Sequence, residues 1–172
     1  MPKLLFFFLL LHLPGLSKAQ PNGPPDTFSV FFFLLEDCKI TQAYTDKMQH
    51  LVQEFAGDSI QFQGYFPNPI SEDSTVHAFI QKHKLPFPCT REAAAGAARR
   101  FSVTVTPEVV VYNETRQTVV YQGRIDNLYE RVGLRRQVVT SHELEAALYC
   151  IRHNKPVPIP RTNAVGCFLD LN

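Results

Sequence analysis

Two kinds of hydrophobic pattern alternate along the first part of this chain. Residues 27–35 form a continuous apolar run rich in Phe, with the length and composition of a strand buried on both faces. Residues 44–55 carry apolar side chains at helical spacing, and Gly57 ends this predicted helix. Residues 60–66 are a second predicted strand. Such alternation is typical of an α/β fold with parallel strands and right-handed crossovers.

The middle of the chain continues the alternation and then adds a hairpin. A helix is predicted to begin at Ser71, and an Ala-rich helix is predicted over residues 92–101. Residues 108–112 and 118–122 are β-rich and close in sequence, which predicts an antiparallel hairpin. We therefore expect a mixed central β-sheet flanked by helices, the architecture of thioredoxin-like domains.

A last helix and a tail complete the pattern. Thr140 and Glu143 have the spacing of a capping box, and the apolar residues of 144–151 form one helical stripe. Cys150 lies beside this stripe, which favours an inert core thiol. Prolines at 156, 158 and 160 end the helix and predict an irregular C-terminal tail.

The N-terminus has the pattern of a secretory signal peptide. Lys3 supplies a positive charge, residues 4–13 are apolar, and Ser17 and Ala19 place small residues before a cut that leaves Gln20 first. The apolar run is short for a membrane span, and the alternative is an uncleaved N-terminal anchor. Either form places the domain outside the cytosol, where disulfides persist.

Composition and charge narrow the classes of partner. We expect a signal peptide over 1–19, a Pro/Gly-rich lead-in over 20–26 and one domain over 27–172. The chain is 45% hydrophobic and 19% charged, an ordinary globular balance. Without 1–19 it has 15 basic and 16 acidic residues, and its Lys and Arg do not cluster. This argues against nucleic acid as a partner, and against a membrane unless the signal is uncleaved.

Among the four cysteines, Cys38 has the setting of a redox thiol. It directly follows the buried strand and begins the next helix, where unpaired N–H groups and the helix dipole stabilise a thiolate. The negative charge of Asp37 opposes this effect. The alternative is a small buried residue at a strand end. Thr41 stands where the second cysteine of a C-x-x-C motif would be, so Cys38 has no local partner.

A proline opens the predicted hairpin. Thr106-Pro107 stands where thioredoxin-like folds carry a cis-proline beside the redox cysteine, and we expect the cis form here. The backbone at Thr106 then has an edge that an extended peptide substrate can pair with. The alternative is a trans proline at the first position of a strand, where proline is tolerated.

Four segments, in order, resemble the motifs of a bacterial exported redoxin-domain family related to peroxiredoxins and membrane-anchored thiol-disulfide oxidoreductases. They are D-C-x-I-[ST] at 37–41, T-P-E-V at 106–109, G-R-I-D at 123–126 and A-V-G-C at 164–167. Lys39 departs from the family, which has Pro there. The resemblance implies a thioredoxin-like fold, thiol-disulfide exchange, no cofactor and no metal. It also implies protein thiols or disulfides as partners, an envelope electron donor, and location in the periplasm or cell envelope of a bacterium.

The resemblance also assigns roles to residues. Cys38 is the expected catalytic nucleophile, and Thr106 and Pro107 are expected to shape the substrate groove. Thr41, at a position where the family has a hydroxyl, and Arg124 are further candidates for substrate binding. The alternative for Arg124 is a structural salt bridge with a nearby acid.

Cys167 is the expected disulfide or resolving partner of Cys38. An extended chain spans about 3.3–3.6 Å per residue, so residues 154–167 are long enough to return to Cys38 across a small domain. Gly166 permits a close backbone approach. Both cysteines also lie in the motifs that resemble the family. Cys89, which ends a short extended piece, is the alternative partner.

Other functions remain open at this point. The rival to an exchange enzyme is a non-catalytic binding module or a copper-site assembly factor, because thiolate and imidazole suit copper. The six His residues, however, show no ligand spacing with Cys38. An atypical thiol peroxidase is a second alternative. It is disfavoured because Leu35 stands where a peroxidatic cysteine usually has a Thr.

Overall fold

The fold is that of a computed structural model, which describes residues 25–57 and 59–171. The predicted signal peptide and most of the lead-in lie outside the described residues. Within the described part, no helix has the length and apolar character that crossing a membrane requires.

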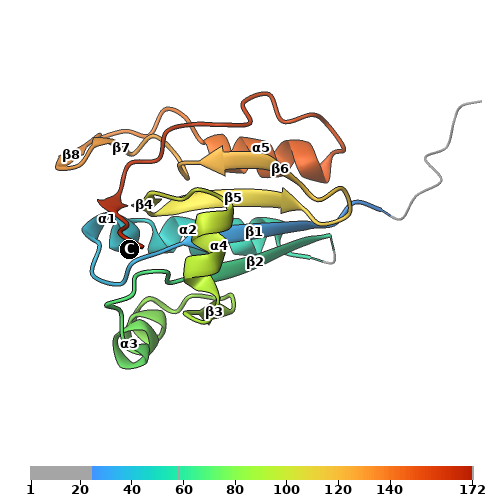
Figure 1. The fold of residues 1–172 in the computed structure, drawn as a ribbon. Coiled ribbons are helices and arrows are strands. Elements are labelled where there is room, and N and C mark those ends of the chain that lie inside the picture. Colours follow the sequence, from blue (N-terminus) through green and yellow to red (C-terminus); the bar gives the residue numbers. More distant parts are fainter. Residues whose placement is uncertain (1–24, 58, 172) are drawn as a thin grey trace, which may run out of the picture.

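A five-stranded mixed sheet forms the centre of the molecule (Figure 1). Its strands, in spatial order, are β3 (Cys89–Thr90), β2 (Ile60–Tyr65), β1 (Phe28–Phe33), β5 (Glu108–Asn113) and β6 (Thr118–Gly123). β1, β2 and β3 run parallel, whereas β5 pairs antiparallel with both β1 and β6. The predicted mixed sheet and its hairpin are therefore confirmed.

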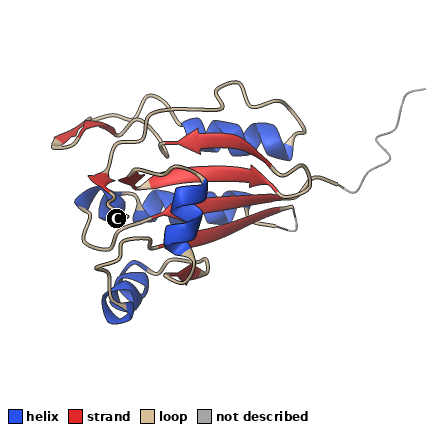
Figure 2. Cartoon of the chain, viewed as in Figure 1, coloured by secondary structure: helices blue, strands red, loops and turns tan. Residues whose placement is uncertain are grey.

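Helices cover both faces of the sheet (Figure 2). They are α1 (Lys39–Ala43), α2 (Thr45–Phe55), α3 (Asp73–His83), α4 (Ala94–Arg100) and α5 (Glu143–Arg152). α4 lies against one face, and α2 and α5 lie against the other (Figure 1). This is the thioredoxin-like arrangement that the order of elements predicts.

The two faces explain why β1 is apolar at every position except Ser29. Val30 and Phe32 belong to the core on the α2 and α5 side, and Phe33 belongs to the smaller core on the α4 side. On β5, Val111 and Val110 divide between the same two cores. Because successive strand side chains point to opposite faces, a strand covered on both sides needs apolar residues at every position.

The predicted capping box of α5 is wrong. His142 occupies the N-cap position of α5, and its side chain makes no hydrogen bond to the first turn of the helix. The Thr140 hydroxyl instead accepts a hydrogen bond of 2.8 Å from the Asn127 side-chain amide, and Glu143 accepts hydrogen bonds from Arg124. Partners from the loop after β6 therefore take both side chains that the local pattern assigned to the cap.

The start of α3 also differs slightly from the prediction. The helix begins at Asp73 rather than at Ser71, and Glu72 and Thr75 form its capping box. The Ser71 hydroxyl donates a 2.8 Å hydrogen bond to the buried carboxylate of Glu36. Ser71 therefore ties the loop after β2 to the loop after β1, which leads to Cys38.

The C-terminal tail is more regular than predicted. It contains β9 (Cys167–Phe168), which pairs antiparallel with β4 (Val105–Thr106).

A small hairpin lies before α5 and consists of β7 (Tyr129–Arg131) and β8 (Leu134–Arg135). Strands of two or three residues are too short to show a hydrophobic period, so the sequence pattern does not reveal them.

Candidate functional site

Cys38 lies at the end of the loop that follows β1, at the N-cap position of α1. Its backbone is extended, and its carbonyl accepts a 2.9 Å hydrogen bond from the Gln42 N–H. The residue is only 1% exposed and belongs to the main core. The setting at the junction of strand and helix is thus the one expected, but the thiol is covered.

Cys38 and Cys167 form a disulfide bond. Their Cα atoms are 6.1 Å apart, within the usual range for disulfides, and 129 positions separate them in sequence. This is the pairing that we expected from the length of the tail and the family-like motifs. Cys89, the alternative partner, is a free thiol, as is Cys150.

The Thr106–Pro107 peptide bond is cis, as predicted, and it lies beside the disulfide. The Cys38 sulfur is 3.3 Å from the Thr106 carbonyl oxygen. Thr106 and Pro107 are both buried. The structure therefore brings together four of the residues that we selected from sequence: the two cysteines, Thr106 and Pro107.

The chain's own tail pairs with the backbone at Thr106. In the β4–β9 ladder, Thr106 lies opposite Cys167 and Val105 lies opposite Phe168. The ladder continues with a 2.9 Å hydrogen bond from the Leu169 N–H to the Thr104 carbonyl. The edge that we expected to bind an extended peptide substrate is thus occupied here by β9.

Glycine at position 166 makes this close pairing possible. A Cβ atom built on Gly166 would lie 2.5 Å from the Thr106 carbonyl carbon and closer still to its oxygen. Any side chain there would collide with backbone, which has little freedom to move away. The close approach that the sequence suggested for Gly166 is therefore made against the residue that precedes the cis-proline.

The tail is held on both sides of Cys167. Before it, the Thr162 N–H donates a 3.0 Å hydrogen bond to the Gln122 carbonyl, and the Thr162 hydroxyl accepts one of 3.1 Å from the Arg124 N–H. After it, Leu169 is 5% exposed and packs in the core under α4. Sequence analysis missed Thr162 and Leu169 as determinants of the site, because only the fold brings them beside β6 and α4.

Thr41 lies three residues after Cys38 and is completely buried. Its hydroxyl has no hydrogen-bond partner among residues 25–57 and 59–171. A substrate cannot reach Thr41 while the protein keeps this conformation. The predicted contact of Thr41 with substrate therefore has no support from its position.

Arg124 is engaged with Glu143 at the start of α5. Its Nε donates a 2.8 Å hydrogen bond to a Glu143 carboxylate oxygen, and a second guanidinium nitrogen pairs with the same oxygen. Burial alone would raise the pKa of Glu143, but its hydrogen bonds, of which the one from Arg124 has the largest effect, and the charge of Arg124 together hold the pKa below its ordinary value. The geometry matches the salt-bridge alternative for Arg124, with Glu143 as the acid.

The two free cysteines are both partly exposed but differ in their surroundings. Cys89 on β3 packs against Gly64, and burial raises the pKa of its thiol to about 12. Cys150 is partly exposed and lines a groove beside Glu54 and Phe55 of α2, so it is less covered than a core thiol would be. Neither residue is joined to the disulfide site.

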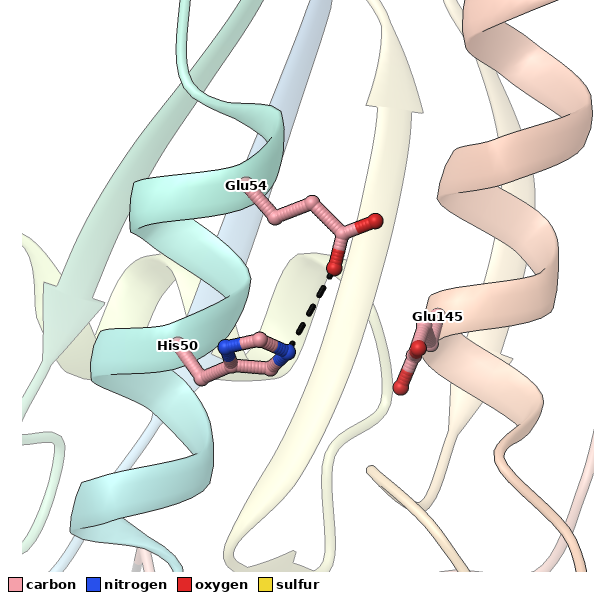
Figure 3. Close-up of side chains that lie close together, drawn as sticks. All are labelled: His50, Glu54 and Glu145. Carbon is pink, nitrogen blue, oxygen red and sulfur yellow. Dashed lines mark ion pairs between the residues drawn. The ribbon is translucent and has the colours of Figure 1, made fainter.

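One group of potential metal ligands lies between α2 and α5 (Figure 3). His50 Nε2 is 3.5 Å from a Glu54 carboxylate oxygen, and a Glu145 oxygen completes a set within 4.8 Å. Lys47 already pairs with Glu145, and Arg152 pairs with Glu54. The group therefore acts as an ion-pair network that joins the two helices, and it includes neither cysteine of the disulfide.

Comparisons with known proteins support the fold. No protein-family model matches the chain, and no curated protein matches it. Among the solved structures that resemble it, three have 13–19% sequence identity. An uncharacterized conserved protein from Geobacillus kaustophilus has 18% identity and a TM-score of 0.70 over 85% of this chain and 78% of its own. A hypothetical protein from Sinorhizobium meliloti has 19% identity and a TM-score of 0.71 over 84% and 80%.

The third structure is that of dsbF from MTB in mixed oxidised and reduced forms. It has 13% identity and a TM-score of 0.53 over 73% of this chain and 81% of its own. At such low identity these likenesses establish the fold, which is thioredoxin-like.

Proposed function

We propose that this protein is an exported thiol-disulfide oxidoreductase whose Cys38–Cys167 pair alternates between disulfide and dithiol. One observation carries the proposal: a disulfide joins a cysteine at the strand–helix junction to a tail strand, directly beside the cis Thr106–Pro107 bond. The structural likeness to dsbF from MTB, solved in mixed oxidised and reduced forms, supports this proposal. Protein thiols or disulfides are the proposed partners, with a dithiol protein of the cell envelope as electron donor.

Each cysteine of the pair has a defined part in the exchange. When a partner dithiol reduces the protein, the S–S bond between Cys38 and Cys167 accepts two electrons and the partner leaves as a disulfide. When a partner disulfide reoxidises the protein, the Cys38 thiolate attacks the mixed disulfide between Cys167 and the partner, closes the bond to Cys167 and expels the partner thiolate. The anchored tail keeps Cys167 near Cys38 in both states, which favours rapid closure.

The proposed location is the periplasm or cell envelope of a bacterium. The signal-like N-terminal pattern supports export, and a disulfide such as the one between core and tail persists best in an oxidising compartment. Detection of the processed chain, beginning at Gln20, in a periplasmic fraction would test this location. A chain that keeps Met1 and stays in the cytosolic fraction would contradict it.

A redox titration tests the proposed exchange. The purified protein is equilibrated in glutathione or dithiothreitol buffers, and the fraction of Cys38–Cys167 disulfide is measured by alkylation and mass spectrometry. We expect a potential of about −120 to −270 mV, the range of exchange proteins, together with catalysed reduction of insulin. Cys38→Ala should abolish that activity, whereas Cys89→Ala, which removes a free thiol, should retain it.

The non-catalytic scaffold is the second candidate, and the tail favours it. Because β9 already occupies the edge at Thr106, the disulfide is placed as a structural cross-link that holds the tail to the core. A structural disulfide has a potential below about −300 mV, so the same titration separates the two functions. A potential in that low range, with no insulin reduction, would replace the exchange proposal by the scaffold.

A further inference from the structure

The two cysteines of the disulfide differ in their exposure to solvent. Cys38 is 1% exposed, and its sulfur lies 3.3 Å from the Thr106 carbonyl within the main core. Cys167 is partly exposed on the two-residue strand β9. The next residue, Phe168, is 76% exposed, and because neighbouring side chains of a strand point to opposite faces, it lies on the face of β9 turned away from the Cys167 side chain.

The cover over Cys38 is fixed in place. Gly166 contacts the Thr106 backbone so closely that no side chain fits between them, and Leu169 is buried under α4. Thr162 ties the preceding part of the tail to the end of β6. A partner therefore meets the tail first, and it cannot pair with Thr106 while β9 lies there.

Thiol-disulfide exchange requires in-line approach of a thiolate to one sulfur, on the side opposite the leaving sulfur, and access decides which sulfur is attacked. Cys38 is almost completely buried, whereas Cys167 is partly exposed. The burial of the pair thus selects Cys167 as the sulfur that a partner reaches.

We propose that the partner attacks Cys167, so that the mixed disulfide forms on the tail and Cys38 is the leaving thiolate. This order of attack deepens the proposed function and rests on it. It differs from the pattern expected from sequence, in which the cysteine at the strand–helix junction meets the partner. Cys38 keeps its role as the internal nucleophile that breaks the mixed disulfide when the reaction runs toward oxidation.

The reaction balances with a dithiol partner. The first partner thiolate forms a bond to the Cys167 sulfur while the Cys167–Cys38 bond breaks, and the electron pair leaves on Cys38, which then takes up a proton. The second partner thiolate attacks the partner's own sulfur in the mixed disulfide and expels the Cys167 thiolate. The partner is oxidised to a disulfide, and the protein is reduced by two electrons.

Quenched exchange with glutathione tests the order of attack. The oxidised full chain is mixed with reduced glutathione and quenched with N-ethylmaleimide at successive short times. Trypsin places the four cysteines in four different peptides, which end at Lys39, Arg91, Arg152 and the C-terminus. We expect the first adduct to carry glutathione on the Cys167 peptide and maleimide on the Cys38 peptide. The reverse labelling at the earliest times would overturn the proposed order.

Single-cysteine variants provide an independent measurement. In a background with Cys89→Ala and Cys150→Ala, the Cys38→Ala chain keeps only Cys167, and the Cys167→Ala chain keeps only Cys38. We expect Cys167 to react with an aromatic disulfide at least tenfold faster than Cys38. Adding Gly166→Val to the chain that keeps only Cys38 should displace the tail and raise the rate of Cys38. A covered Cys38 that reacts as fast as Cys167 would overturn the proposal.

Failure of the proposed function gives a different result. If neither glutathione nor dithiothreitol opens the disulfide in the folded protein, the exchange function is wrong and the order of attack falls with it. If the disulfide opens and the first adduct is on Cys38, only the order of attack is wrong.

Discussion

Gly166 lies directly against the backbone of Thr106, and this contact allows β9, the strand that carries Cys167, to pair beside the cis-proline. A Cβ atom on Gly166 would lie 3.0 Å from the Thr106 nitrogen and closer to its carbonyl group. Only glycine can make this contact. Because the contact holds β9 against β4, it also keeps Cys167 at the position where it can bond to Cys38.

Gly166→Ala should move β9 away from β4 and slow the closure of the disulfide. We expect the rate of reoxidation of the reduced protein to fall about tenfold, because Cys167 is no longer held beside Cys38. The rate is measured by quenching the reoxidation with an alkylating reagent at successive times and counting the free thiols by mass spectrometry. Gly96→Ala on α4 is the matched control, since a Cβ atom there meets nothing within 4 Å. Equal rates for both variants would contradict a positioning role for Gly166.

Reduction of the disulfide should lower stability without unfolding the sheet. The bond closes a loop between residues 129 positions apart, for which the chain-entropy model gives about 4–5 kcal/mol. The tail contacts at Thr162 and Leu169 do not depend on the bond. We expect urea unfolding of the oxidised and reduced protein to differ by up to that amount, while Cys167→Ala shows no dependence on reductant. A reductant effect that persists in Cys167→Ala would contradict this explanation.

Thr41→Val should stabilise the oxidised protein. The Thr41 hydroxyl is buried and has no hydrogen-bond partner within the described parts of the chain, and such a group costs about 1–3 kcal/mol. Valine has nearly the same shape and removes this cost, so we expect a gain of about 1 kcal/mol in urea unfolding. Thr45→Val is the control, because the buried Thr45 donates a 3.0 Å hydrogen bond to the Gln42 carbonyl. Loss of stability in both variants would show that Thr41 has a partner after all.

Sequence patterns predicted the features that depend on neighbours along the chain. The apolar run of β1, the hairpin of β5 and β6, and the position of Cys38 before α1 all follow from local spacing. Features that depend on contacts across the fold were missed or misassigned. The cap of α5 is wrong because Asn127 and Arg124 take the polar groups of Thr140 and Glu143.

The candidate site shows the same division. Pro107 and the two cysteines carry recognisable motifs, so the sequence selected them correctly as neighbours. The pairing of β9 with β4 involves only two residues on each strand, which is too few for a hydrophobic period. The sequence therefore left the edge at Thr106 open for a substrate, although the tail occupies it. Gly166 was the only local signal of that contact.

The Arg124–Glu143 pair should make stability depend on pH in the acid range. Because Arg124 lowers the pKa of Glu143 in the folded protein, the pair stabilises the fold at neutral pH, and this contribution is lost as pH falls below about 4. We expect Glu143→Gln to cost roughly 2 kcal/mol at pH 7 and much less at pH 3. Unfolding in urea at both pH values measures the difference. A cost that is equal at both would show that the charge of Glu143 is not involved.

The two free thiols of the oxidised protein should differ sharply in reactivity. Burial raises the pKa of Cys89 to about 12, so only about one thiol in ten thousand is ionised at pH 8. Cys150 lines the groove beside α2, and both thiols are partly exposed, so the difference rests on the ionisation of Cys89. We expect iodoacetamide at pH 8 to label Cys150 in the folded protein much faster than Cys89, and unfolding in urea to raise the rate of Cys89, as measured by mass spectrometry of the tryptic peptides. Labelling of Cys89 at the rate of Cys150 in the folded protein would show that burial does not hold back the ionisation of its thiol.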